Sequence, residues 1–392
     1  MKRVLSLATL YPNAHRPRFG TFVAAQMAAL AARGDWDVTV LNPIGVPPVP
    51  MARYAPLASA AVTGVEHGVT VHRPRFTLIP GIGGRFNPAM IVRAVLPLAR
   101  RLHALAPFDL IDAQFFYPDG PAAAQIAAAL DLPLSIKARG ADISLWAGKS
   151  YARRKMLKAA QQADGLLAVS EALAADMAGR GFPRSKITVH YTGLDRTRFC
   201  PRDRRQSRER ITAFGVVLPA DAPLLVTVGA LIPRKGQHYV LRALARLPEA
   251  HLALVGEGPD QAMLEAFARD TGMAARVHFL GSLDHEALPM LLSAADAMVL
   301  PSASEGLANA WVEAIACGCP LVITDAGGAR EVLDRPEAGL IVERDGAAIA
   351  AGVKTLLAHP PQRDAVARSA ERFSWKANAA ALAAYYDRLV RR

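Results

Sequence analysis

The stretch DAMVLPSASEGLANAWVEAIACGCPLVIT, residues 296–324, contains one complete strand–loop–helix–strand unit. Residues 296–301 and 320–324 are short and apolar, which is typical of buried strands. A helix is expected over residues 309–317, with Gly318 as its C′ residue. Strands joined by helices form parallel sheets covered on both faces, so this stretch predicts an α/β fold.

The same alternation continues in both directions along the chain of 392 residues. A chain of this length is too long for one ordinary hydrophobic core, so two domains are expected. Each is predicted to be Rossmann-like, and the two are expected to face a cleft. Apolar segments predict strands over residues 3–10, 37–41, 109–113, 133–138 and 165–170 in the first half, and over 223–229, 251–256, 276–281, 296–301, 320–324 and 338–342 in the second.

The domain boundary is expected where the composition changes. Residues 196–210 hold seven arginines and few core residues. We therefore predict a first domain over residues 1–195, a second domain over residues 196–374, and a terminal helix within residues 375–392.

The net charge of the chain is +12, which favours anionic partners. Helix-turn-helix, zinc-finger and RRM signatures do not accompany this charge, so no nucleic-acid partner is expected. Residues 149–158, KSYARRKMLK, interleave five cations with Tyr151, Met156 and Leu157. A basic amphipathic helix of this kind lies on an anionic membrane, and an ordinary solvated helix face explains the same pattern.

Cysteine usage and hydropathy bear on the compartment. Cys200, Cys317 and Cys319 form neither a metal-type spacing nor a disulfide framework, so we expect no metal site, no cofactor and a reducing cytoplasm. The longest run without a charged residue, 38–52, has 15 residues and four prolines, which is too short and too broken to span a bilayer. Peripheral binding at the inner face of the membrane is the alternative to a purely cytoplasmic location.

Ligands of doubly wound sheets bind at the carboxyl ends of the strands, so the loops that follow the strands hold the candidate site. In GALIPRKGQ, residues 229–237, Arg234 and Lys235 stand between a strand and a helix start. Free N–H groups and the dipole at a helix N-terminus attract phosphate, and two cations there suit a diphosphate. The Walker pattern is absent, and a basic surface turn is the alternative interpretation.

Glycine-rich turns follow several other strands. VGEGPD (255–260) and FLGS (279–282) allow the backbone to approach a flat ligand, although ordinary turns explain them equally well. In TDAGGAREVL (324–333), the N–H groups of Gly327 and Gly328 are expected to form an anion-binding nest. In the first half, the loop at Gly20 lies between a strand and a helix and is expected at the same edge of its sheet.

Two glutamates lie eight positions apart in the opening stretch. Glu305 is a loop residue beside a helix start, whereas Glu313 lies one turn into the helix. This separation is too large for an acid/base pair. Two acceptors at different depths suit a polyhydroxylated ligand better than proton shuttling.

The segments GALIPRKG, VGEGP, SEGLANAWVEA and GGAREV, in this order and spacing, resemble glycosyltransferase family four, whose members have the GT-B fold and retain anomeric configuration. YPNAHRPRFGTFVAAQ (11–26) and FSWKANAAALAAYYDRL (373–389) resemble the first loop and the terminal crossover helix of that family, so the resemblance covers nearly the whole chain. The resemblance implies a metal-independent, retaining hexosyltransferase with a nucleoside diphosphate sugar as donor. The segment SEGLAN is similar to the motif of a subset of family members, and that subset is frequent among polysaccharide-building enzymes. The implied acceptor is therefore a glycan or a lipid-linked glycan.

The resemblance also assigns roles to residues. Arg234 and Lys235 neutralise the donor diphosphate, Glu305 binds the donor sugar, and Glu313 binds the ribose hydroxyls. The full set of implied substrate-binding residues is Gly20, Arg139, Asp142, Gly256, Leu280, Gly306, Leu307, Asn309, Glu313, Gly327, Gly328 and Glu331.

The chain departs from the family pattern at two positions that bear on the chemistry. Ala230 stands where many members carry an arginine, and Arg139 begins Arg-Gly-Ala-Asp where many carry histidine. A non-catalytic nucleotide-sugar-binding protein therefore remains an alternative, as does a nucleotide-sugar epimerase on the same fold. The epimerase requires acid/base residues in the cleft, and the sequence points to none there.

Overall fold

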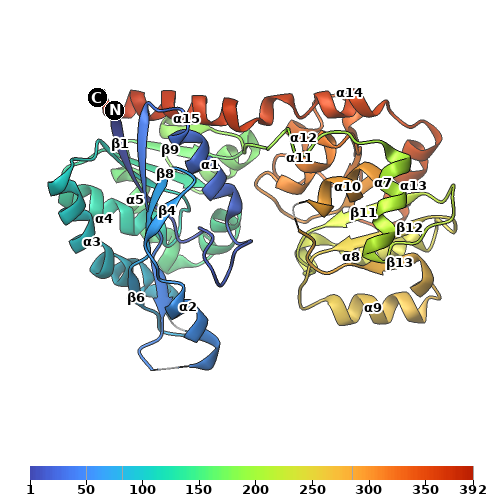
Figure 1. The fold of residues 1–392 in the computed structure, drawn as a ribbon, viewed down its shortest axis with the longest axis horizontal. Helices are drawn as coiled ribbons and strands as arrows, with labels where there is room; N and C mark the ends of the chain where they lie inside the picture. Colours follow the sequence, from blue (N-terminus) through green and yellow to red (C-terminus); the bar gives the residue numbers. More distant parts are fainter. Residues whose placement is uncertain (50, 82, 285, 392) are drawn as a thin grey trace. The chain divides into compact units, whose positions relative to one another are not determined.

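The computed structural model describes residues 1–49, 51–81, 83–284 and 286–391. The chain forms two compact units (Figure 1). The first contains Met1–Gly193 together with Trp375–Arg392, and the second contains Leu194–Ser374. The predicted boundary between residues 195 and 196 lies two residues from this division.

The sheet of the first unit has the order β10-β9-β8-β7-β1-β2-β5-β4. Its neighbours pair in parallel except β4 and β5, which are antiparallel at one edge. A separate parallel pair joins β3 to β6. The strands are β1 (Lys2–Leu7), β2 (Trp36–Leu41), β3 (Ile44–Val46), β4 (Gly64–Glu66), β5 (Val69–His72), β6 (Arg75–Thr77), β7 (Leu110–Ala113), β8 (Leu134–Ala138), β9 (Gly165–Ala168) and β10 (Ile187–Val189).

Helices cover this sheet, and the terminal helix is one of them. α15 packs beside α1 and contacts β7, while α3, α4 and α5 pack in succession (Figure 1). Trp36 and Tyr386 meet edge to face, with ring centroids 5.4 Å apart, so α15 completes the core of this unit. The helices are α1 (Thr21–Ala31), α2 (Ala55–Ser59), α3 (Asn87–Leu105), α4 (Asp119–Leu130), α5 (Ser150–Gln162), α6 (Glu171–Gly179) and α15 (Trp375–Val390).

The sheet of the second unit is wholly parallel, with the order β13-β12-β11-β14-β15-β16. Each of its strands coincides with an apolar segment predicted from the sequence. They are β11 (Leu224–Val228), β12 (His251–Val255), β13 (Val277–Phe279), β14 (Ala297–Leu300), β15 (Leu321–Ile323) and β16 (Gly339–Ile341).

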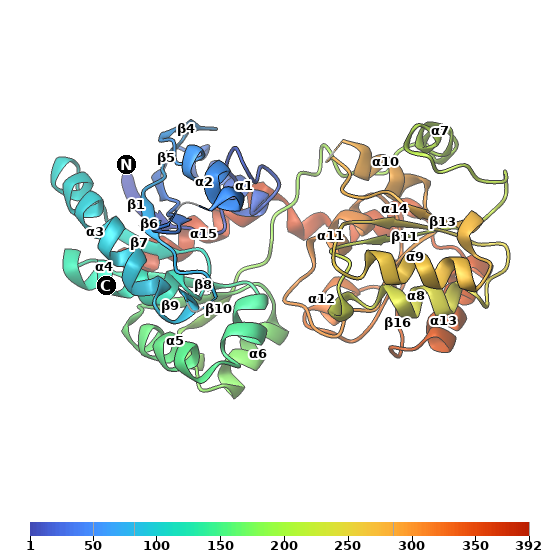
Figure 2. The ribbon, with the colours of Figure 1, turned by 90° about the horizontal axis from the view of Figure 1, so that it is seen from below.

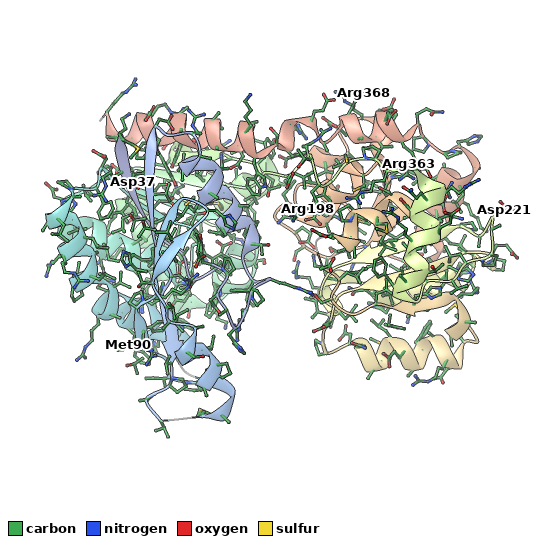
Figure 3. All side chains as sticks on the ribbon, in the orientation of Figure 1. Asp37, Met90, Arg198, Asp221, Arg363 and Arg368 are labelled. Carbon is green, nitrogen blue, oxygen red and sulfur yellow. The ribbon has the colours of Figure 1, made fainter. Side chains whose placement is uncertain are left out.

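The helices of the second unit form two groups. α8 packs against α9 and α13, whereas α10 packs against α7 and α11, and α11 against α14 (Figure 2). Side chains fill the space between the sheet and the helices of each unit (Figure 3). The helices are α7 (Arg204–Arg210), α8 (Gln237–Leu244), α9 (Gln261–Asp270), α10 (Ala287–Ala294), α11 (Asn309–Ala316), α12 (Ala329–Val332), α13 (Gly346–Ala358) and α14 (Arg363–Arg368).

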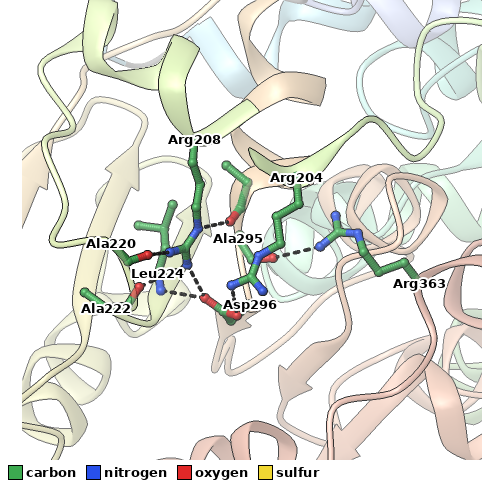
Figure 4. Close-up of polar contacts among 9 residues, drawn as sticks. Arg204, Arg208, Ala220, Ala222, Leu224, Ala295, Asp296 and Arg363 are labelled. Carbon is green, nitrogen blue, oxygen red and sulfur yellow. Dashed lines mark hydrogen bonds and ion pairs between the residues drawn. The ribbon is translucent and has the colours of Figure 1, made fainter. Parts of the chain in front are cut away.

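Part of the arginine-rich segment forms the helix α7 of the second unit. Arg204 and Arg208 of α7 both form ion pairs with Asp296, which lies immediately before β14 (Figure 4). Arg208 also donates to the carbonyl oxygens of Ala220 (3.1 Å) and Ala222 (3.0 Å). These arginines therefore anchor α7 within the second unit.

The basic helix α5 wholly or partly buries the apolar residues on which the predicted membrane contact depended. Met156 is fully buried and Leu157 is half-buried, whereas Arg153, Arg154 and Lys158 are exposed. The apolar side of α5 therefore packs largely into the core, and its outer side is polar, with Gln161 and Gln162 exposed besides the cations. Among the described residues, no helix has both the length and the apolar character that crossing a membrane requires.

Candidate functional site

Two loops of the second unit bring Arg234, Lys235 and Glu305 together. Lys235 follows β11 and Glu305 follows β14, and these two strands are neighbours in the sheet. Lys235 Nζ donates to Glu305 Oε1 at 2.5 Å, and Arg234 Nη1 lies 3.4 Å from Glu305 Oε2. The side chains of Lys235 and Glu305 are only 13% and 9% exposed. The cluster therefore holds two cations beside one carboxylate, and water has restricted access to Lys235 and Glu305 but not to Arg234, whose side chain is 37% exposed.

Backbone contacts lock the two loops to each other. Ala303 N–H donates to the Arg234 carbonyl at 2.8 Å, and the Arg234 guanidinium donates to the Ser304 carbonyl. Gly236 adopts φ +76°, and a Cβ there would lie 2.5 Å from the Pro301 carbonyl oxygen. Only glycine fits this turn, which ends the loop and starts α8.

Arg344 supports the same loops, and sequence reasoning missed it. Its Nε donates to the Pro301 carbonyl (2.8 Å) and its Nη2 to the Pro233 carbonyl (2.9 Å). Its guanidinium also lies 4.9 Å from the ring centre of Tyr239. Arg344 follows β16, and this position after a strand end is the only sequence feature that could have identified it as a site residue.

Glu313 lies on α11, behind the loop of Glu305. Its side chain is half-buried, and among the described residues no group forms a hydrogen bond or ion pair with its carboxylate. Desolvation raises the pKa of the carboxyl group to about 7. Hydroxyl groups of a ligand would supply the hydrogen bonds that this acceptor lacks.

The glycines after β11 and β12 lie against each other. A Cβ on Gly256 would lie 2.1 Å from the Gly229 carbonyl oxygen, and Gly256 N–H donates to the Gly281 carbonyl at 2.7 Å. Gly256 therefore allows neighbouring loops to approach one another, and its approach to a flat ligand stays a prediction. Leu280 N–H likewise donates to the Leu254 carbonyl (2.9 Å).

The predicted anion-binding nest is incomplete. Gly328 N–H donates to the Gly306 carbonyl at 2.8 Å, so it is not available to a ligand. Gly327 N–H has no acceptor among the described residues. The nest prediction was therefore wrong for Gly328, although the contact places Gly327 beside the Glu305 loop. Gly306, Leu307 and Asn309 run from Glu305 into the start of α11, and Glu331 lies in the short helix α12.

In the first unit, the predicted residues follow β1 and β8. Gly20 precedes α1, and Arg139 immediately follows β8. The Asp142 carboxylate accepts backbone N–H groups from Phe116 (2.8 Å) and Gly140 (2.9 Å), and further ones from Arg139 and Ile143. Asp142 is buried and its oxygens organise this turn, which leaves little capacity for the predicted substrate contact.

The fold of the chain is GT-B, and two family models indicate its class. A model of the family described as Glycosyltransferase Family 4 matches residues 20–198, and one described as Glycosyl transferases group 1 matches residues 210–373. The chain therefore belongs to the GT-B glycosyltransferases of the family-four type, as the sequence motifs indicated.

Two curated proteins illustrate the similarity. The putative teichuronic acid biosynthesis glycosyltransferase TuaC of Bacillus subtilis is 28% identical over 359 residues, which are 90% of this chain and 88% of that protein. The GDP-mannose-dependent alpha-(1-6)-phosphatidylinositol monomannoside mannosyltransferase of Mycolicibacterium smegmatis is 31% identical over 255 residues, which are 61% of this chain and 66% of that protein.

Solved structures share the fold over the whole chain. Sucrose-phosphate synthase from Thermosynechococcus elongatus has a TM-score of 0.79 and 22% identity, and the match covers 99% of both chains. The Anabaena protein HepE in complex with UDP has a TM-score of 0.74 and 22% identity, with 99% of this chain and 100% of that chain covered.

Proposed function

We propose that the chain is a retaining glycosyltransferase that transfers a sugar from a nucleoside diphosphate sugar to a hydroxyl group of a glycan or lipid-linked glycan. The cluster of Arg234, Lys235 and Glu305 beside the start of α8 carries this proposal. The names of TuaC and of the mannosyltransferase favour a place in polysaccharide or glycolipid assembly.

The chemistry follows from charge. The bond from the anomeric carbon to the diphosphate breaks, and the bond to the acceptor oxygen forms on the same face of the sugar. Arg234 and Lys235 stabilise the negative charge that grows on the departing diphosphate. The acceptor hydroxyl attacks from the face that the diphosphate leaves, so the reaction requires no protein nucleophile, and the leaving phosphate takes the acceptor proton, so it requires no protein base.

A panel of nucleoside diphosphate sugars tests the donor class. A donor present at ~100 times its dissociation constant adds about 2.7 kcal/mol to the free energy of unfolding, which thermal denaturation detects. Transfer of the sugar from the stabilising donor is then measured with glycan acceptors. Binding without turnover favours the non-catalytic alternative, and isomerisation of the free donor favours the epimerase.

The proposal includes catalysis without a metal. Among the described residues, no group of three or more histidine, cysteine or acidic side chains is placed to hold an ion. We expect transfer rates to remain unchanged in EDTA, because Arg234 and Lys235 supply the positive charge. Loss of turnover on chelation, with recovery on adding Mg²⁺ or Mn²⁺, would contradict this expectation.

We also propose peripheral binding to anionic membranes, through charge and not through insertion of α5. The exposed side of α5 presents Arg154 and Lys158. Phe86 and Leu145 are 45% and 58% exposed. The segments that hold them contact each other, because a Cβ on Gly84, near Phe86, would lie 3.2 Å from the ring of Trp146, which follows Leu145.

Replacing Arg154 and Lys158 with glutamate is expected to weaken binding to anionic vesicles more than tenfold. Each cation near an anionic surface contributes about 1 kcal/mol, and salt screens the attraction. Arg246→Glu, an exposed site in the second unit, is the control. Vesicle co-sedimentation at low and high salt measures the effect, and equal binding to neutral vesicles would contradict it.

The raised pKa of Glu313 predicts a pH-dependent donor affinity. Its pKa of about 7 lies above the ordinary value of 4.5, so the folded chain favours the protonated form and loses this stabilisation as pH rises from about 4.5 to 7. A ribose hydroxyl donates to the ionised form. We therefore expect donor affinity to rise with pH up to about 7 and then level off.

Calorimetry with a nucleoside diphosphate sugar measures this profile, because its esterified phosphates keep a constant charge near neutral pH. Glu313→Gln is the matched control and should remove the pH dependence. A wild-type profile as flat as that of the variant would show that Glu313 does not receive the ligand.

A further inference from the structure

Arg139 is held in one orientation by three contacts. Its Nε donates to the Gln114 backbone carbonyl at 2.8 Å, and its Nη2 donates to Gln114 Oε1. The guanidinium also lies 4.8 Å from the ring centre of Phe22, in the first turn of α1. Among the described residues, no acceptor binds its Nη1, so the N–H groups of that nitrogen are unused.

Gln114 is itself fixed on both sides of its amide. Its Oε1 also accepts from Gln26 Nε2 at 3.2 Å, and its Nε2 donates to Asp112. Gln26 in turn accepts from Lys137 Nζ at 2.9 Å. All four of these side chains are buried, so the support for Arg139 is rigid.

Arg139 has no ion-pair partner within contact distance among the described residues, although Asp142, Asp112 and Asp119 attract its charge from farther away. The nearby acids are all occupied: Asp112 accepts from Ser6 and Gln114, Asp119 accepts from Thr9, and Asp142 accepts four backbone N–H groups. None of them forms an ion pair with Arg139 in the described part of the chain. Burial lowers the pKa of Arg139 to about 10, so its charge persists at neutral pH. A half-buried guanidinium with one unpaired nitrogen is completed by an anion that accepts hydrogen bonds from that nitrogen.

We propose that Arg139 is an oxyanion-binding residue, that Gln114 is its positioning residue, and that a phosphate group of a substrate is the ligand. The binding of a phosphate by Arg139 does not depend on the proposed function, but the assignment of that phosphate to a substrate rests on it. A histidine at this position is largely neutral at physiological pH, whereas arginine keeps a fixed charge and a planar fork that matches phosphate oxygens. The phosphate belongs either to the donor diphosphate or to a phosphorylated acceptor.

Inorganic pyrophosphate is the probe for the site itself. Calorimetry is performed with chains carrying Lys235→Ala, which removes the more buried cation of the proposed diphosphate site in the second unit. Adding Arg139→Gln is expected to weaken pyrophosphate binding about tenfold, the size expected for one charged hydrogen bond. Arg139→Lys should recover only part of the affinity, and Arg93→Gln, an exposed site on α3, should have no effect. Absence of pyrophosphate binding to the Lys235→Ala chain, or equal affinity in the Arg139→Gln chain, overturns the proposal.

Gln114→Met tests the positioning role. It should reduce pyrophosphate affinity about as much as Arg139→Gln, and the double variant should be no worse than either single one. A melting temperature within the range of the folded variants shows that the loss is local. Additive losses would mean that Gln114 acts independently of Arg139.

The source of the phosphate is identified with the chain that retains Lys235. If Arg139→Gln weakens binding of the nucleoside diphosphate, the ligand is the donor diphosphate. If it raises only the acceptor KM, the ligand is an acceptor phosphate. If it changes neither while the pyrophosphate effect stands, Arg139 binds an anion outside the reaction and the proposed ligand is wrong. Pyrophosphate binding is measured without turnover, so failure of the glycosyltransferase proposal does not decide this test.

Discussion

Replacing Lys235 with alanine is expected to lower kcat/KM by roughly 10²-fold or more, which is the loss typical of one preorganised charge contact. Lys235 Nζ is fixed by Glu305 at 2.5 Å and is largely shielded from water. Its charge is therefore in place before negative charge develops on the diphosphate, and it acts in a medium of low polarity. Arg234, which is more exposed and lies farther from Glu305, is expected to compensate only in part.

Steady-state kinetics with the cognate donor measures this loss. Lys235→Arg tests whether charge alone is sufficient, and Arg246→Ala removes an exposed cation of the same unit as the control. Circular dichroism establishes that each variant is folded. Near-normal turnover in a folded Lys235→Ala chain would remove Lys235 from the leaving-group site.

The strands of the second unit were predictable because parallel strands buried on both faces are continuous apolar runs. In the first unit, β3, β4 and β6 have three residues each, and β4 and β5 lie toward the sheet edge. Short strands at an edge leave little hydrophobic pattern, so sequence reasoning missed them. The antiparallel pairing of β4 with β5 also departs from the wholly parallel sheets that the alternation predicts.

The candidate site was predictable to the level of strand ends and no further. The sequence places Lys235 and Glu305 after two strands, but their contact depends on β11 and β14 being neighbours, which only the sheet order shows. The contacts of Arg344 depend on the sheet order too, because Arg344 follows β16 and donates to carbonyl groups in the loops after β11 and β14. A glycine such as Gly256 gives the same sequence pattern whether it faces a ligand or another loop.

Glu313→Ala is expected to weaken binding of the free nucleoside diphosphate tenfold or more, whereas Glu305→Ala should mainly lower turnover. The Glu313 carboxylate has no partner among the described residues, so it is available to the ribose hydroxyls. A hydrogen bond to a charged group contributes roughly 1.5–3 kcal/mol, which sets the size of the loss. Glu305 instead lies against Lys235 and Arg234, where we expect it to contact the transferring sugar.

The contact between Glu305 and the two cations sharpens this prediction. Removing the Glu305 carboxylate frees Lys235 and Arg234 to attract phosphate, so Glu305→Ala should bind the nucleoside diphosphate at least as tightly as the unchanged chain. Its kcat should nevertheless fall, because the sugar loses an acceptor that positions it in the transition state. Glu305→Gln and Glu313→Gln keep the size of each side chain and separate charge from packing. Calorimetry alongside steady-state rates distinguishes the two glutamates, and equal loss of nucleotide affinity in both alanine variants would show that they do not bind opposite ends of one donor.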